Sequence, residues 1–172
     1  PEVEGMLGQS NESNHINLIE SINDVEGLEL SEDLDISYTT QTTLSVDDTK
    51  LIVNSLKTKF PKIQEPKKSD ICYATQNRQD SVKVMIKNSE MLLVIGSKNS
   101  SNSNRLKEIA EKSGKPAYLI DGSADIKNEW LSGIDSIGVT AGASAPEILV
   151  QAVVSYLMMN GGSEVVEVSG TK

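Results

Sequence analysis

Cysteine, histidine and aromatic residues are all scarce in this sequence of 172 residues. Its single cysteine excludes an internal disulfide framework and is typical of a reducing compartment, so we expect a cytoplasmic location, or a plastid in a eukaryotic cell. Its single histidine argues against a self-contained Cys/His zinc site. Aromatic residues make up 3% of the chain, too few to predict a platform on which nucleic-acid bases could stack.

Long apolar runs and the common phosphate-binding glycine motifs are also missing. No run approaches the roughly 18 residues needed to cross a bilayer, and no basic segment followed by an apolar one opens the chain. We therefore expect neither a membrane span nor a secretory signal. The sequence contains no Walker A motif, no G-x-G-x-x-G and no G-x-S-x-G, which excludes the common nucleotide-binding and serine-hydrolase sites.

Negative charge is concentrated in the first third of the chain. The net charge is −9, yet residues 1–50 contain twelve acidic residues and one basic residue, so the remainder is nearly neutral. This balance argues against nucleic acid and against an anionic membrane as partners. We interpret the acidic excess as a solvated surface.

Alternating strand and helix patterns predict an α/β fold with mainly parallel sheets. The apolar run at 91–95 is typical of a buried parallel strand. Ser45 and Asp48 predict a capping box for a helix that ends near Lys59. Residues 61–70 contain two prolines and three lysines and are expected to link two subdomains. Further strands are expected at 16–19, 35–41, 71–74, 117–120, 136–140 and 164–168, and further helices at 22–28, 78–88 with Asn77 as cap, 104–112, 124–131 and 145–160.

An unusual run of serine and asparagine follows the strand expected at 91–95. Six consecutive residues, Asn99–Asn104, carry short hydrogen-bonding side chains, more than one helix cap requires. Because a helix follows, its N–H groups and the positive end of its dipole are available to an anion. Ligands of open parallel sheets bind at this edge, beyond the carboxyl ends of the strands. The run is therefore either an anion site or a polar surface turn.

Three other positions leave a structural and a functional interpretation open. Ser144 and Glu147 have the spacing of a capping box, so Ser144 either caps a helix or faces a ligand. Thr42 either favours a strand, opens a helix or offers its hydroxyl to a ligand. Cys72 lies near the end of an expected strand, where a lone cysteine is either a buried apolar residue or one thiolate ligand of an iron–sulfur cluster.

Three long motifs of the sequence resemble those of one enzyme family. They are Ile71–Gln79 (ICYATQNRQ), Val94–Leu106 (VIGSKNSSNSNRL) and Gly138–Glu147 (GVTAGASAPE). Together with Thr40–Asp48 and Pro1–Gly5, they resemble the 4-hydroxy-3-methylbut-2-enyl diphosphate reductases, which are LytB-type iron–sulfur enzymes. The likeness extends from Pro1 to about Gly162, with the motifs in the same order.

The resemblance implies a reaction and a fold. The family reduces an allylic diphosphate, 4-hydroxy-3-methylbut-2-enyl diphosphate, to isopentenyl and dimethylallyl diphosphate, the last step of the non-mevalonate isoprenoid pathway. Its fold is a trefoil of three α/β domains around a central 4Fe–4S cluster. The reaction implies an external electron donor of the ferredoxin or flavodoxin type.

The resemblance also implies roles for particular residues. Cys72 matches one of three cluster-binding cysteines, and Glu2 matches the carboxylate that helps deliver protons to the substrate. Thr42 matches a hydroxyl near the substrate alcohol. The diphosphate-binding positions are matched by Ser100, Ser101, Asn102 and Ser144.

Compared with the family, this chain is expected to be roughly two thirds of a whole enzyme. The two other cysteines of the family are not in the sequence, so we expect no stable 4Fe–4S cluster on this chain alone. Residues 1–66 are expected to form most of the second lobe and residues 67–172 the third. The residues themselves leave two other functions open: a non-catalytic α/β module that binds a phosphorylated metabolite, and a phosphosugar enzyme that uses Glu2 or Asp121.

Overall fold

Two units, Pro1–Cys72 and Tyr73–Lys172, make up the chain. The computed structural model describes residues 2–9, 15–31, 34–68 and 70–168. No helix within these ranges is both long enough and apolar enough to cross a membrane.

A three-stranded parallel sheet forms the centre of the second unit. Its strands are β1 (Met91–Ile95), β2 (Ala117–Ile120) and β3 (Ile137–Ala141), in the order β2-β1-β3. All five residues of the central strand are apolar and buried, as expected of a strand covered on both faces. The expected α/β class is therefore confirmed, and so is the parallel sheet.

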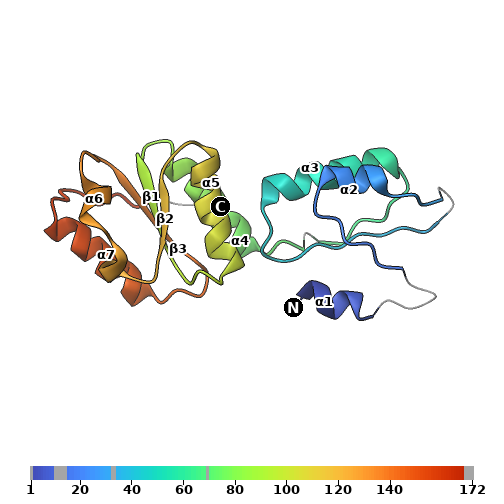
Figure 1. Cartoon of the computed structure of the whole chain (residues 1–172), viewed down its shortest axis with the longest axis horizontal. Coiled ribbons are helices and arrows are strands. Elements are labelled where there is room, and N and C mark those ends of the chain that lie inside the picture. Colours follow the sequence, from blue (N-terminus) through green and yellow to red (C-terminus); the bar gives the residue numbers. More distant parts are fainter. Residues whose placement is uncertain (1, 10–14, 32–33, 69, 169–172) are drawn as a thin grey trace. The chain divides into compact units, whose positions relative to one another are not determined.

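Helices cover both faces of this sheet (Figure 1). On one face, α4 (Tyr73–Met85) and α5 (Ser101–Lys112) pack against Leu92 and Val94. The other face carries the short η1 (Ser123–Asp125), α6 (Asn128–Leu131) and α7 (Glu147–Met159), which surround Met91, Leu93 and Ile95. Side chains of β1 alternate between the two cores because successive residues of a strand point to opposite faces. The carboxyl ends of β1 and β3 therefore lie side by side, where α5 and the loop before α7 begin.

In its described part, the first unit contains helices joined by long irregular segments. It contains α1 (Glu2–Leu7), α2 (Ile22–Gly27) and α3 (Val46–Lys59). Ser21 and Asp24 form a complete capping box at α2. Ser45 is the N-cap of α3, as expected, and accepts a hydrogen bond from the Asp48 N–H. The core of this unit consists of Val25, Leu56 and Phe60.

Residues 61–66 pack within the first unit, so this part of the linker expected at 61–70 is wrong. The Gln64 N–H donates to the Ile36 carbonyl at 2.8 Å, and Ser37 and Gln64 form a parallel bridge. Glu65 accepts hydrogen bonds from Lys57 at 2.8 Å and from the Tyr38 hydroxyl at 3.3 Å. The bond from Lys57 lowers the pKa of the Glu65 carboxyl, whereas burial raises the pKa of Tyr38. Two prolines therefore mark a packed turn here and no flexible connection.

The strand expected at 71–74 is also wrong, because α4 begins at Tyr73 and Asn77 lies inside the helix. Thr75, Gln79 and Val82 are the buried residues of α4, and their spacing is that of one helical face. The strands expected at 16–19, 35–41 and 164–168 are wrong as well. A strand needs a hydrogen-bonded neighbouring strand. In the described ranges, β1, β2 and β3 have such neighbours, and the one further β-bridge is an isolated one between Ser37 and Gln64.

Candidate functional site

The first turn of α5 stands directly beyond the carboxyl end of β1. The helix begins at Ser101, three residues earlier than expected, because Ser100 is the N-cap and its Oγ accepts the Ser103 N–H at 3.3 Å. The Asn104 side chain fixes the preceding loop by donating to the Lys98 carbonyl at 2.8 Å and the Ser100 carbonyl at 2.9 Å. This N-terminus therefore presents the positive end of a twelve-residue helix from a loop held in one conformation.

Asn102 lies buried in this first turn without a hydrogen-bond partner. Asn102 is only 5% exposed, and neither the Oδ1 nor the Nδ2 of its side chain has a partner among the residues that the structure describes. Leaving one buried polar group unpaired costs about 1–3 kcal/mol, and native proteins contain few such groups. A bound ligand would satisfy the amide. The asparagine therefore favours an anion site over a polar surface turn at this loop.

Ser144 lies in the turn that follows β3, at the same edge of the sheet. The Gly142 N–H donates to the Ile95 carbonyl at 2.8 Å, and the Ala145 N–H donates to the Gly142 carbonyl at 3.1 Å. The expected capping box is wrong, because the N-cap of α7 is Pro146 and no side chain caps that helix. Ser144 is exposed, so its hydroxyl is available to a ligand.

Ser103 stands between the loops that follow β1 and β3. It is fully buried, and a Cβ added at Gly96 or at Gly142 would overlap its Oγ. From α4, the Arg78 Nε donates to the Ala141 carbonyl at 3.2 Å, which fixes the end of β3. The structure therefore brings the loop that carries Ser100–Asn102 and the loop that carries Ser144 to one edge of one sheet, as expected.

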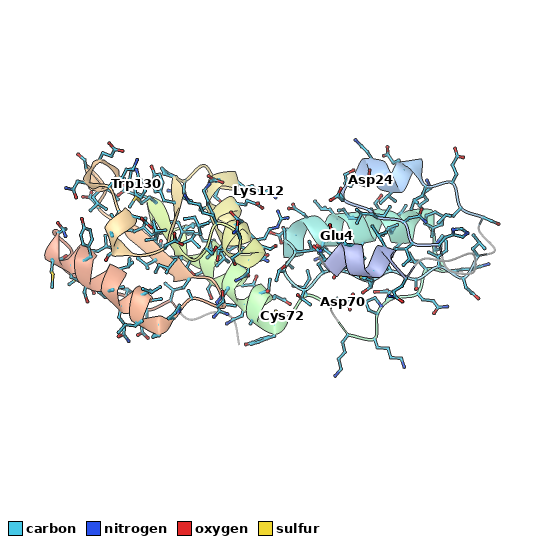
Figure 2. All side chains as sticks on the ribbon, turned by 60° about the horizontal axis from the view of Figure 1, so that its bottom comes forward. Glu4, Asp24, Asp70, Cys72, Lys112 and Trp130 are labelled. Carbon is cyan, nitrogen blue, oxygen red and sulfur yellow. The ribbon has the colours of Figure 1, made fainter. Side chains whose placement is uncertain are left out.

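Thr42 and Cys72 are close to each other in the first unit. The Cys72 N–H donates to the Thr42 carbonyl at 3.2 Å. Nearby, the Asp70 carboxylate accepts hydrogen bonds from the Thr39 hydroxyl at 3.1 Å and the Thr40 N–H at 2.8 Å. Cys72, which is labelled in Figure 2 and directly precedes α4, is exposed. Its interpretation as a buried apolar residue is therefore wrong. Thr42 is exposed as well and does not cap a helix.

The structure gives less support to two acidic candidates, Glu2 and Asp121, as site residues. The backbone of Glu2 opens α1, but its side chain lies outside the described part of the structure. Asp121 is exposed and follows β2, where its N–H donates to the Asp125 carboxylate at 2.8 Å, a bond that shapes the turn into η1. Nothing in this geometry favours Asp121 as a catalytic acid.

Comparison with known proteins assigns the chain to a family. The profile of the LytB protein family matches residues 1–158. The chain belongs to the LytB family. A LytB relative from Vesicomyosocius okutanii, named 4-hydroxy-3-methylbut-2-enyl diphosphate reductase, is 63% identical over 172 residues, which are 100% of this chain and 56% of the relative. A Pseudomonas aeruginosa protein of the same name is 54% identical over 172 residues, 99% of this chain and 55% of its own.

A solved structure of a diphosphate reductase agrees with the fold. The E-1-hydroxy-2-methyl-but-2-enyl-4-diphosphate reductase of Plasmodium falciparum matches 91% of this chain and 49% of its own, with a TM-score of 0.84 and 36% identity. The chain thus spans about half the length of the LytB relatives that it matches, less than the two thirds expected.

The residues of this LytB chain do not suffice for a 4Fe–4S cluster. Such clusters are held mainly by cysteine thiolates, commonly four. The sequence supplies one, Cys72, and the described residues contain no group of three or more histidine, cysteine, aspartate or glutamate side chains that could hold a metal ion. No chemical step can therefore be assigned to a cluster on this chain alone.

Sequence reasoning missed two residues that shape this LytB site. Ser103 was counted only as part of the serine and asparagine run, and Gly96 was not singled out. The signal for Ser103 is its spacing of three residues from the helix cap, which brings both side chains onto one turn. The signal for Gly96 needs the sheet, because only the parallel pairing of β1 and β3 shows that two glycines face the same serine.

Proposed function

We propose that the second unit binds the diphosphate group of an allylic diphosphate at the first turn of α5. The observation that carries this proposal is the unpaired, buried amide of Asn102. Ser100 and Ser101 flank it on the α5 side, and Ser144 approaches from the loop after β3. Ser101 and Ser144 are exposed at this edge.

Hydrogen bonds and the helix dipole can hold such an anion without a cluster of lysines. A hydrogen bond to a charged group contributes about 1.5–3 kcal/mol, and the N-terminus of a helix adds typically about 0.3–1 kcal/mol. Three or four donors of this kind are enough for a diphosphate. The two loops also provide them from a rigid sheet edge, which limits the conformational entropy lost on binding.

The chain as a whole is proposed to be part of a 4-hydroxy-3-methylbut-2-enyl diphosphate reductase. In this reaction the allylic C–O bond breaks, two electrons and two protons enter, the hydroxyl leaves as water, and isopentenyl or dimethylallyl diphosphate forms. Identity of 63% to a relative of that name supports the proposal. The two units would be most of the second lobe and the third lobe of the three-lobed parent.

The first unit is proposed to supply groups around the reacting end of the substrate. Thr42 would approach the substrate alcohol, Glu2 would deliver protons, and Cys72 would contribute one thiolate to a 4Fe–4S cluster. The hydrogen bond between Cys72 and Thr42 at 3.2 Å supports a shared location for two of these groups. The remaining cluster ligands would come from residues outside this chain, and the electrons from an external ferredoxin or flavodoxin. A cytoplasmic or plastid location fits a single reduced cysteine.

A chimeric enzyme tests this function. These residues would replace the matching segment of the Pseudomonas aeruginosa relative, to which they are 54% identical. We expect the chimera to support growth of cells depleted of their own reductase, because the segment would supply the diphosphate site and one cluster ligand. The same chimera with Cys72→Ser is expected to fail, since a serine oxygen is a poor replacement for a thiolate on iron.

The control for this experiment is the chimera with Ser113→Ala, a change at the far end of α5 that we expect to be tolerated. A chimera that accumulates as folded protein yet supports no growth, while the unaltered relative does, would contradict the proposed function. Growth with Cys72→Ser would contradict the role of the thiolate.

A further inference from the structure

Within the described part of the chain, the hydroxyl of Ser103 hydrogen-bonds to one partner, the hydroxyl of Ser100. Ser103 is fully buried, and its Oγ lies against the backbone of Gly96 and Gly142. Its hydrogen-bond partner is Ser100 Oγ, and the two oxygens are 3.0 Å apart. Among the described residues this hydroxyl makes no hydrogen bond to another acceptor. A buried O–H without an acceptor is costly, so Ser103 must donate to Ser100 and cannot accept from it.

Ser100 therefore accepts two hydrogen bonds at one oxygen. The first is the capping bond from the Ser103 N–H at 3.3 Å, and the second is the bond from the Ser103 hydroxyl at 3.0 Å. A serine hydroxyl has two acceptor positions and one donor. Both acceptor positions are filled from inside the protein, which leaves the Ser100 proton as its remaining hydrogen-bonding capacity.

We propose that Ser103 is a positioning residue that holds the Ser100 hydroxyl as a hydrogen-bond donor to a bound diphosphate. The inference rests on the proposed function, because it needs an anion at the first turn of α5. Diphosphate oxygens that carry negative charge only accept hydrogen bonds, so a hydroxyl free to rotate would have to be reoriented on binding. Ser103 fixes the orientation of the Ser100 hydroxyl before the ligand binds, which reduces the free-energy cost of ordering that hydroxyl on binding.

Two glycines, Gly96 and Gly142, leave the space that the Ser103 hydroxyl occupies. Gly96 follows β1 and Gly142 follows β3, and a side chain at either would occupy the space of the Ser103 hydroxyl. The pair therefore lets a buried serine sit between the two loops and keep its bond to Ser100. Ser103 does not itself need to touch the ligand.

A double-mutant cycle tests the inference, with inorganic pyrophosphate as the probe and titration calorimetry on this chain as the measurement. Ser103→Ala is expected to weaken binding about three- to tenfold, as loss of one hydrogen bond does. Ser100→Ala is expected to weaken it at least as much. In the Ser100→Ala background, Ser103→Ala is expected to change the affinity by less than about twofold, because its only route to the ligand is gone.

Ser113→Ala is the matched control. It removes a serine hydroxyl at the other end of α5, where Oγ donates to the Ile109 carbonyl at 2.9 Å, and it is expected to leave the affinity unchanged. Circular dichroism of each variant checks that the helix content is retained. An equal loss of affinity from Ser103→Ala in both backgrounds would show a packing role and overturn the inference, and so would no loss in the wild-type background.

The proposed function fails in a different way in the same experiment. If the wild-type chain does not bind pyrophosphate, or if Asn102→Ala leaves binding unchanged, the anion site itself is wrong. If Asn102→Ala weakens binding while the two serine changes act independently, the site stands and the role of Ser103 is wrong.

Discussion

Replacing Leu106 by alanine is expected to lower the free energy of unfolding of the second unit by about 2–5 kcal/mol. Leu106 is fully buried in α5 and packs in one cluster with Val82 of α4 and Val94 of β1. The substitution removes apolar contacts and leaves a cavity among three elements that hold the first turn of α5 in place. Urea unfolding followed by the fluorescence of Trp130 measures the effect. Trp130, labelled in Figure 2, is the one tryptophan in the sequence. Its ring stacks on that of Tyr118 in the same unit, with 3.9 Å between the ring centroids.

Ile148→Ala is the control for this prediction. Ile148 belongs to the same unit but is 70% exposed on α7, so its removal is expected to change the free energy of unfolding by less than about 0.5 kcal/mol. Equal unfolding midpoints for Leu106→Ala and Ile148→Ala would mean that α5 is not anchored as described.

Replacing Asn102 by alanine is expected to weaken pyrophosphate binding by about 10–100-fold, the loss of one hydrogen bond to a charged group. Without ligand, the free energy of unfolding is expected to stay within about 1 kcal/mol of the wild type, because the amide that is removed had been buried without a partner. Calorimetry and urea unfolding on the same samples measure the two quantities. A site residue of this kind contributes to binding and not to the stability of the folded chain.

Asn160→Ala is the matched comparison for Asn102→Ala. The Asn160 amide at the end of α7 donates to the Tyr156 carbonyl at 2.8 Å, so it has a partner in the protein. Its removal is expected to leave pyrophosphate affinity unchanged. If Asn102→Ala instead left the affinity unchanged and lowered the stability by several kcal/mol, Asn102 would be a structural residue.

The central parts of the second unit could be predicted from the sequence because their signals are strong and local. The run Met91–Ile95 can only be buried on both faces, and its burial follows from its composition. The serine and asparagine run lies beyond the carboxyl end of β1, as its place after the apolar run predicted. Likewise, Ser45 with Asp48 predicted the start of α3, since the capping bond joins residues only three positions apart.

Other features depend on contacts that a local pattern does not contain. Ile71–Ala74 has a strand-like composition, yet α4 begins at Tyr73, because the buried face of Thr75, Gln79 and Val82 packs in the second unit. Ser144 has the spacing of a capping residue, but Pro146 is the N-cap of α7. In both cases the tertiary environment outweighs a weak local preference.

The role of Ser103 could not be predicted for a related reason. Its importance depends on two glycines, Gly96 and Gly142, that are far apart in the sequence and meet only in the folded sheet. A buried serine within a polar run has no signal of its own. The motif that resembles the family includes it, but the resemblance implies no role for it.

An amide NMR titration of the isotope-labelled chain with inorganic pyrophosphate tests the central claim most directly. The claim is that the loops after β1 and β3 form one anion site in the second unit. We predict that the largest shift changes fall on the first turn of α5, at Ser100–Asn102, and on the turn at Gly142–Ser144, and that they saturate with one affinity. Shift changes confined to surface lysines, or changes at only one of the two loops, would contradict the claim.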